Sequence, residues 1–539
     1  MKKALSIILA SCMTLSAMAQ LRYQNRPPEK RQSVSQLERD VQKMVMATAM
    51  IYNYYVASVD SRRLAEDAIN GILKKLDPHS AYSNAQETKK FTEPLEGSFE
   101  GIGVQFNVLE DTLVVIQPVP KGPSEKVGIL AGDRIVSVND TAIAGVKMSR
   151  EEIMHRLRGR KGSHVDLGVV RREISDTLHF DVVRDKIPVN SVDAAYMVTP
   201  RIGLIRFNNF AQTTHAEVVE AIKKLRAQGM VDLIIDLQQN GGGYLQAAAD
   251  IASEFLAKND MIVYTRGRSV PNQEFRSSGS GLFTQGKVAV LVDEYSASAA
   301  EILSGAIQDQ DRGIVVGRRT FGKGLVQRPI ELPDGSMIRL TVAKYYTPSG
   351  RCIQKPYEKG DRRSYDRDVI NRYNNGELTN ADSIHFPDSL RFQTLREKRV
   401  VYGGGGIMPD YFVPLDTTQY TRLHRQLAAK GIIIKVNLKY VDNHRKQLRR
   451  QYPSFQTFLN NFQVPQSVID EVMAEGKKEK VEPKDDDEFK KTLPQLCAQL
   501  KALVARDLWD MSEYFQIINQ QNHIVEKAIE VMGDEQAWK

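Results

Sequence analysis

The chain has 539 residues, of which 42% are hydrophobic and 26% charged, so it is long enough for about three or four globular domains. Its formal net charge is +8, but the sequence has no aromatic-interleaved basic motif and no metal-finger spacing, which argues against nucleic-acid binding. After the N-terminal segment, no stretch reaches the roughly 18 apolar residues that a membrane span requires.

Residues 1–19 are predicted to be a secretory signal peptide. Two lysines precede an apolar run, and Ala17-Met18-Ala19 forms an A-x-A cleavage site, so Gln20 is the expected first mature residue. This predicts a periplasmic protein. Lipidation of Cys12 is an alternative, because the residues before it resemble a lipoprotein signal; against it, the apolar run continues past the cysteine.

Residues 35–95 are predicted to be helical, because apolar residues recur at helical spacing within Val41–Tyr55 and Leu64–Leu76. The next segment, residues 97–185, alternates short strands with turns and has one amphipathic helix near Arg150–Leu157. These patterns predict a helical N-terminal region followed by a β-rich domain.

Residues 190–415, with 186–195 as a linker, are predicted to form an α/β core. Apolar strands alternate with amphipathic helices there, as is typical of that class. The predicted strands are 202–207, 231–237, 288–292 and 314–317, and the predicted helices are 217–227 and 244–256.

The remaining residues, 416–539, are predicted to be polar and helical. The charge run Lys477–Lys491 predicts a solvated linker. A helix over Leu493–Trp509 would belong to a C-terminal module for dimerisation or for docking a partner.

Three polar segments each follow a predicted strand of the core: Gln238–Gly243, Asp293–Glu301 and Thr320–Gln327. The second contains Ser298 and the third contains Lys323. A buried lysine that has lost its proton can activate a serine hydroxyl, and no histidine occurs between His215 and His385 to serve instead. A glycine turn before a helix can present N–H groups to an oxyanion.

Each segment also has an ordinary structural interpretation. Ser298 with Glu301 is a Ser-x-x-Glu capping box, and a serine and a helix start can serve both purposes. Lys323 between two glycines fits a solvated turn, and Gln238–Gly243 fits a common β–α turn.

The combination resembles the carboxy-terminal processing proteases, also called tail-specific proteases, over about residues 35–415. The resemblance is carried by five motifs in the family's order: Leu76–Ser80 (LDPHS), Asp236–Gly243 (DLQQNGGG), Tyr295–Glu301 (YSASAAE), Phe321–Gln327 (FGKGLVQ) and Tyr345–Gly350 (YYTPSG). It implies a serine endopeptidase with a serine–lysine dyad, a crotonase-like α/β core and an inserted PDZ domain.

The resemblance also implies roles for individual residues. Ser298 would be the nucleophile, Lys323 the base and Gln327 the residue that positions the lysine amine. The oxyanion hole would use the backbone N–H groups of Gly242 and Ala299. Asp309 matches an acidic position with a supporting role, Gly241 departs from the family's usual proline, and Ala300 stands where many relatives have serine.

The string Leu130–Asn139 (LAGDRIVSVN) marks residues 97–185 as similar to a PDZ domain. Its carboxylate-binding loop would be Gly101, Ile102, Gly103 and Val104, which would hold a protein's terminal carboxylate while the tail adds as a strand. The expected partners are protein substrates with apolar C-terminal tails. An adaptor protein and a homo-oligomer are further partners left open, and neither a metal nor another cofactor is expected.

Two other function classes, a nucleotide hydrolase and a catalytically inactive PDZ scaffold, fit the sequence less well. Gly317–Lys323 matches the first part of a phosphate-binding loop, but Gly324 stands where a Mg²⁺-ligating serine or threonine is required. The chain has no His-Glu-x-x-His string for metal-dependent proteolysis. A catalytically inactive PDZ scaffold is the other alternative, and loss of peptide cleavage in Ser298→Ala would separate it from the enzyme.

Overall fold

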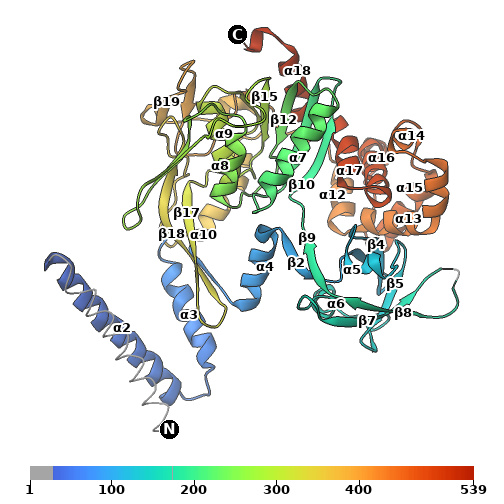
Figure 1. The fold of residues 1–539 in the computed structure, drawn as a ribbon, viewed down its shortest axis with the longest axis horizontal. Coiled ribbons are helices and arrows are strands. Elements are labelled where there is room, and N and C mark those ends of the chain that lie inside the picture. Colours follow the sequence, from blue (N-terminus) through green and yellow to red (C-terminus); the bar gives the residue numbers. More distant parts are fainter. Residues whose placement is uncertain (1–27, 173, 539) are drawn as a thin grey trace. The chain divides into compact units, whose positions relative to one another are not determined.

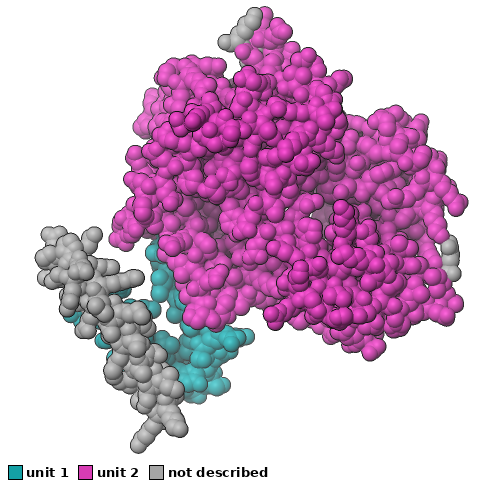
Figure 2. All heavy atoms as spheres, viewed as in Figure 1, with its two compact units in different colours: residues 1–76 teal, residues 77–539 magenta. Residues whose placement is uncertain are grey.

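The computed structural model describes residues 28–172 and 174–538. The predicted signal peptide, with its cleavage site before Gln20 and the alternative lipidation site Cys12, lies outside the described residues. The chain forms two compact units, divided between Leu76 and Asp77 (Figure 2). No helix among the described residues has both the length and the apolar character needed to cross a bilayer.

The first unit contains two described helices, α2 (Pro28–Tyr54) and α3 (Ser61–Leu73). Asp60 begins α3, since its carboxylate accepts hydrogen bonds from the N–H groups of Arg62 and Arg63. The second unit starts with a turn at Asp77, followed by β1 (Ala81–Ser83) and α4 (Ala85–Glu96). The residues predicted as one N-terminal helical region are therefore shared between the two units.

The segment similar to a PDZ domain forms an antiparallel sheet in the order β3-β4-β5-β7-β8 (Figure 1). Its strands are β3 (Val104–Leu109), β4 (Thr112–Pro118), β5 (Arg134–Val138), β7 (His164–Val170) and β8 (Leu178–Val183), with β6 (Thr141–Ala142) beside β5. Two helices, α5 (Pro123–Lys126) and α6 (Arg150–Leu157), pack with it, and β2 (Ser98–Gly101) pairs with β9 (Asp185–Pro188). The apolar core lies between the sheet and α6.

A six-stranded sheet, β10-β11-β12-β15-β16-β21, is the centre of the α/β core. Its strands are β10 (Val192–Met197), β11 (Ile202–Phe207), β12 (Asp232–Asp236), β15 (Val288–Val292), β16 (Ile314–Gly317) and β21 (Tyr411–Phe412). Only β10 runs antiparallel to its neighbour. The four strands predicted from apolar runs are confirmed.

Both faces of this sheet are covered, which explains why its strands are continuously apolar. Leu233 and Ile235 pack against α7 (Thr214–Ala227), α8 (Leu245–Ser253) and α9 (Ala299–Asp309). The intervening Ile234 points to the other face, where α18 (His523–Gly533) packs. A helix from near the C-terminal end of the described residues therefore completes the core of the α/β sheet.

A second sheet in this region has the order β1-β18-β13-β14, with β17 paired to β18. Its longer strands are β13 (Met261–Arg266), β14 (Gln273–Arg276), β17 (Leu325–Glu331) and β18 (Met337–Tyr346). Two short helices, α10 (Arg362–Asp366) and α11 (Asp368–Asn374), follow, and β19 (Arg391–Gln393) pairs with β20 (Val400–Tyr402). This sheet carries β17, the strand that directly follows Lys323.

The C-terminal region is helical. It contains α12 (Arg422–Ala429), α13 (Ile432–Gln451), α14 (Phe455–Asn461), α15 (Gln466–Lys478), α16 (Asp486–Leu508) and α17 (Met511–Ile518). The prediction of a solvated linker over Lys477–Lys491 is wrong for its second half. Asp485 caps α16 and three acidic residues occupy its first turn, where negative charge is favourable beside the helix dipole.

Candidate active site

Ser298 lies between β15 and α9, at the carboxyl edge of the parallel strands. The loop before it is held by Asp293, whose buried carboxylate accepts hydrogen bonds from the N–H groups of Tyr295 (3.0 Å) and Ser296 (3.1 Å). Ser298 has a φ of 57°, a backbone conformation that costs free energy for a residue with a side chain. The surrounding hydrogen bonds fix this half-buried serine at the start of α9.

The glycine turn after β12 lies directly against the serine. Gly242 has a φ of 98°, and a Cβ atom there would lie 2.8 Å from the Cβ of Ser298, so only glycine fits. The N–H of Gly242 donates to Asn240 Oδ1 at 2.9 Å, while the Asn240 amide donates to the Phe207 carbonyl. In this conformation the predicted oxyanion donor at Gly242 is therefore already paired, whereas Ala299 occupies the first position of α9, where an N–H has no acceptor within the helix.

Glu301 joins the serine segment to the lysine segment. Its carboxylate accepts hydrogen bonds from the N–H of Ser298 (2.8 Å) and the N–H of Lys323 (2.9 Å). It also accepts from the N–H of Gly322 (2.7 Å) and from Thr320 Oγ1 (2.5 Å). The side chain is fully buried, and this burial raises the pKa of Glu301, while the four donors favour its charged form.

Lys323 has the electrostatic environment that a general base requires. Burial, together with the positive charge of Arg339, lowers the pKa of Lys323 to about 8. The amine donates to Gln327 Oε1 at 3.0 Å. At a pKa of about 8, roughly one such lysine in ten is uncharged at pH 7, far more than for a solvated turn lysine with its ordinary pKa.

Gln327 is oriented by the segment at the start of the second unit. Its amide nitrogen donates to the carbonyl oxygen of His79, so its oxygen faces Lys323. The turn is fixed by Asp77, which accepts from the N–H groups of His79 (2.8 Å) and Ser80 (2.9 Å). Thr341 of β18 also donates to Asp77, at 3.0 Å. The LDPHS motif thus positions the partner of the lysine.

Tyr345 places the segments of Ser298 and Lys323 side by side. Its buried hydroxyl lies 2.5 Å from the carbonyl oxygen of Lys323 and 3.1 Å from that of Ser298. Among the hydrogen bonds of the described residues, none joins Ser298 Oγ to Lys323 Nζ. The two segments adjoin, while the hydrogen bond that would link the candidate nucleophile to the candidate base is not formed in this conformation.

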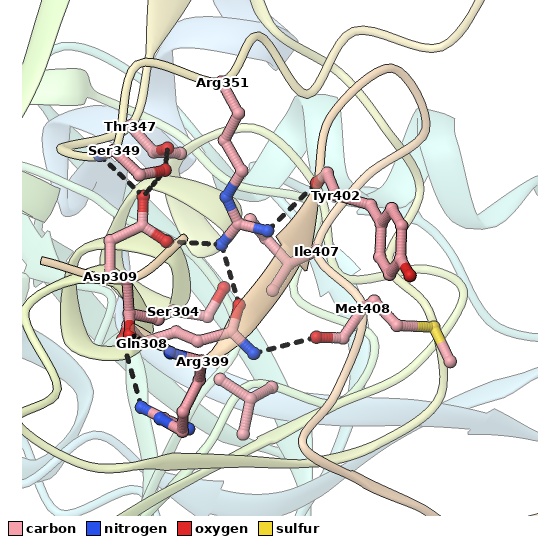
Figure 3. A network of polar contacts seen from close by, with 12 residues as sticks. Ser304, Gln308, Asp309, Thr347, Ser349, Arg351, Arg399, Tyr402, Ile407 and Met408 are labelled. Atoms are coloured by element: carbon pink, nitrogen blue, oxygen red, sulfur yellow. Dashed lines mark hydrogen bonds and ion pairs between the residues drawn. The ribbon is translucent and has the colours of Figure 1, made fainter. Parts of the chain in front are cut away.

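Asp309 lies at the far end of α9 and is fully buried (Figure 3). It accepts from Arg351 at 2.6 Å and from the N–H and hydroxyl of Ser349. The same guanidinium also donates to Gln308 and to the carbonyl of Tyr402. In the described part of the chain, Asp309 makes no hydrogen bond or ion pair with the three predicted catalytic side chains, so any support it gives acts through α9.

The predicted carboxylate-binding loop, Gly101–Val104, joins β2 to β3. The carbonyl of Ile102 accepts hydrogen bonds from the N–H and hydroxyl of Ser124, and Gly103 has a φ of 73°. This loop lies at one end of a groove between β3 and α6.

Sequence reasoning missed the linking role of Glu301, which it treated only as a helix cap. It also quoted Asp77, His79 and Tyr345 as motif residues without a function. A signal for them was present, since each lies in a motif that carries the family resemblance, but their contacts join segments as much as 264 residues apart in sequence.

Comparisons with known proteins identify the families that this chain resembles. The profile of peptidase family S41 matches residues 201–361, and that of the PDZ domain matches residues 101–190. The N-terminal domain of the activating protease CtpB matches residues 8–88, and a family of unknown function matches residues 423–510.

Two curated relatives are carboxy-terminal processing proteases. CtpB of Bacillus subtilis is 34% identical over 334 residues, covering 61% of this chain and 68% of the relative. The protease of Bartonella bacilliformis is 36% identical over 305 residues, covering 56% of this chain and 69% of the relative. The solved photosystem II D1 C-terminal processing protease is 31% identical and has a TM-score of 0.33, covering 56% of this chain and 82% of that one.

These matches define a serine-type peptidase of family S41 with a PDZ domain. The chain belongs to the carboxy-terminal processing proteases.

Proposed function

We propose that this protein is a tail-specific endopeptidase in which Ser298 is the nucleophile and Lys323 the general base. The observation that carries this proposal is the half-buried Lys323 amine, with its pKa lowered to about 8, on a segment that Glu301 ties to the serine. Gln327 supports it, because its amide oxygen accepts from the amine and fixes its direction.

In the proposed reaction, neutral Lys323 takes the proton of Ser298 Oγ as this oxygen attacks the scissile carbonyl carbon. The resulting ammonium then gives its proton to the leaving amine, so that the C–N bond breaks and an acyl-enzyme ester remains. A water molecule, deprotonated by the same amine, then attacks the ester carbonyl carbon. The C–O bond to Ser298 breaks, the ammonium returns its proton to Ser298 Oγ, and the acid product leaves.

The oxyanion would be held by the N–H groups of Ala299 and Gly242, each worth roughly 3–4 kcal/mol in a serine protease. The Gly242 N–H must first leave Asn240 Oδ1. Closing of the site therefore consists of two changes: Gly242 turns from Asn240 to the substrate, and Lys323 approaches Ser298. Asp309 would support these changes only by holding α9.

The substrate would be a protein with an apolar C-terminal tail, bound at Gly101–Val104 of the PDZ domain and extended into the core. The proposed organisation is a helical region at 35–95, the PDZ domain at 97–185, a crotonase-like core at 190–415 and a helical region at 416–539. The signal peptide predicted for residues 1–19 supports a periplasmic location. An adaptor protein and self-association remain part of the hypothesis.

The test uses mature protein and its Ser298→Ala variant with an unstructured reporter that ends in a free apolar tail. The same reporter with an amidated tail is the matched substrate. We expect cleavage of the free tail by wild type only, with at least a 10³-fold loss in the variant. Equal cleavage by both proteins would refute the serine assignment, and equal cleavage of both tails would refute recognition of the terminal carboxylate.

A further inference from the structure

The groove of the PDZ domain has an apolar floor and an unpaired edge. It encloses about 270 Å³ between β3 and α6. Ile102 and Leu157 are buried at its base, and Met154 lines it. Among the described strands β3 is the outermost of its sheet, so a peptide can add to it as a further strand. The last side chain of a tail would contact this floor.

The direction of a bound tail follows from the proposed function, on which this inference rests. The terminal carboxylate would lie at Gly101–Val104. That loop meets the C-terminal end of α6, since a Cβ atom on Gly101 would lie 3.7 Å from both the Cα of Arg158 and the carbonyl oxygen of Leu157. The start of α6, at Arg150, therefore lies upstream along the tail.

The spacing between these ends sets which tail residue meets Arg150. Leu157 lies seven positions after Arg150 in α6, which corresponds to a rise of about 10 Å along the helix. An extended peptide covers the same distance in about three residues. Arg150 thus faces the third residue before the terminal one, and the length of an arginine side chain extends its reach by about one residue in either direction.

Arg150 is a cation without an acidic partner. Its guanidinium lies 5.3 Å from the ring centre of Phe106, a groove residue of β3, and the side chain is exposed. In the described part of the chain no carboxylate pairs with it. The nearby carboxylates form ion pairs with other cations: Glu93 pairs with Arg158, Glu151 with Lys90 and Glu152 with Arg156.

We propose that Arg150 is a specificity-determining residue that selects tails with Asp or Glu about three residues before an apolar C-terminal residue. A carboxylate there would meet the unneutralised guanidinium at the groove edge, whereas a lysine would be repelled. Because the side chain is exposed, the effect is moderate: about two- to fivefold in KM, with kcat unchanged.

The test compares three reporters that share one apolar terminal residue and carry Glu, Gln or Lys three residues before it. Wild type, Arg150→Glu and Arg160→Glu are measured as full-length mature chains. Arg160 is exposed and does not line the groove, so its variant controls for the change in net charge. We expect wild type and Arg160→Glu to rank the reporters Glu, Gln, Lys in kcat/KM, and Arg150→Glu to reverse this ranking.

Binding of the same three peptides to the Ser298→Ala protein, with and without Arg150→Glu, separates this inference from the proposed function. In one outcome no reporter is cleaved, but the peptides bind in the expected order and the order reverses with Arg150→Glu. That outcome would support the role of Arg150 in specificity and refute the proposed protease activity. The same ranking with and without Arg150→Glu, or no binding of any peptide, would overturn the inference.

Discussion

Glu301 is a single buried carboxylate that aligns the two candidate catalytic segments, those of Ser298 and Lys323. An unpaired carboxylate with no exposure to water would carry a large desolvation cost. Here each oxygen accepts two hydrogen bonds, three of them from backbone N–H groups. Backbone donors cannot rotate away, so Ser298 and Lys323 are fixed relative to one another through Glu301. The hydrogen bond from Ser298 to Glu301 that caps α9 is therefore also one of the contacts that align Ser298 with Lys323.

The pH dependence of the reaction tests Lys323. A base acts in its deprotonated form, so activity rises as pH increases through the lowered pKa of about 8. We expect kcat/KM on a tail reporter to increase about tenfold between pH 7 and pH 9, which is the increase in the neutral fraction of such a lysine. His79 cannot cause this rise, because burial lowers its pKa to about 3.

Lys323→Arg is the variant that isolates the proton transfer, since arginine keeps the charge but does not deprotonate. We expect a loss of at least about 10³-fold in kcat at every pH. Lys344→Arg makes the same change at an exposed position on β18 and should leave the profile intact. A flat profile in wild type, or near-normal turnover in Lys323→Arg, would exclude lysine as the base.

At the level of elements, the Asp309–Arg351 pair joins the end of α9 to the loop after β18 (Figure 3). The start of α9 carries Ser298, and β18 carries Tyr345, whose hydroxyl contacts the serine segment. The helix is thus held at both ends against the same part of the second sheet. Asp309 is a positioning residue in this arrangement.

Removing one charge of the buried Asp309–Arg351 ion pair should lower the free energy of unfolding. Arg351→Met leaves the Asp309 carboxylate buried without its cation, and we expect a loss of about 3–5 kcal/mol in the free energy of unfolding. Asp309→Asn combined with Arg351→Met removes both charges and should recover part of this loss. Thermal and denaturant unfolding of wild type, the single and the double variant measure it; equal loss in both variants would argue against an uncompensated charge.

The elements of the core and the candidate catalytic residues were predictable because their signals are local. Apolar runs marked β12, β15 and β16, and short motifs marked Ser298 and Lys323. Contacts between distant segments carry no such local signal. The pairing of the Gly242 N–H with Asn240 and the hydrogen bonding of Gln327 to His79 depend on how segments pack. The acidic string at 485–488 was misread because a charge run and a capped helix start have similar composition.

For the molecule as a whole, the PDZ domain is bound to the C-terminal helices through Asp442 of α13. Its side chain is 8% exposed and accepts from Arg134 at 2.6 Å and from Arg172 at 2.7 Å. Beside this cluster, Val114 of β4 lies opposite Val441 of α13. These contacts use the face of the sheet away from the peptide groove, so a tail can enter the groove while α13 stays docked.

Asp442→Ala should weaken this contact and expose it to solvent. Two arginines lose their shared acceptor, and hydrogen bonds to charged groups contribute about 1.5–3 kcal/mol each. We expect faster amide hydrogen exchange in β4, β5 and α13, with little change in β12 or β15, because local opening requires only the separation of the two domains. Asp470→Ala, at an exposed position of α15, removes the same charge from the same region and should leave exchange unchanged. If Asp442→Ala leaves the exchange of β4 and α13 as in wild type, the apolar contact alone holds the PDZ domain, and the ion pairs with Asp442 contribute nothing to its position.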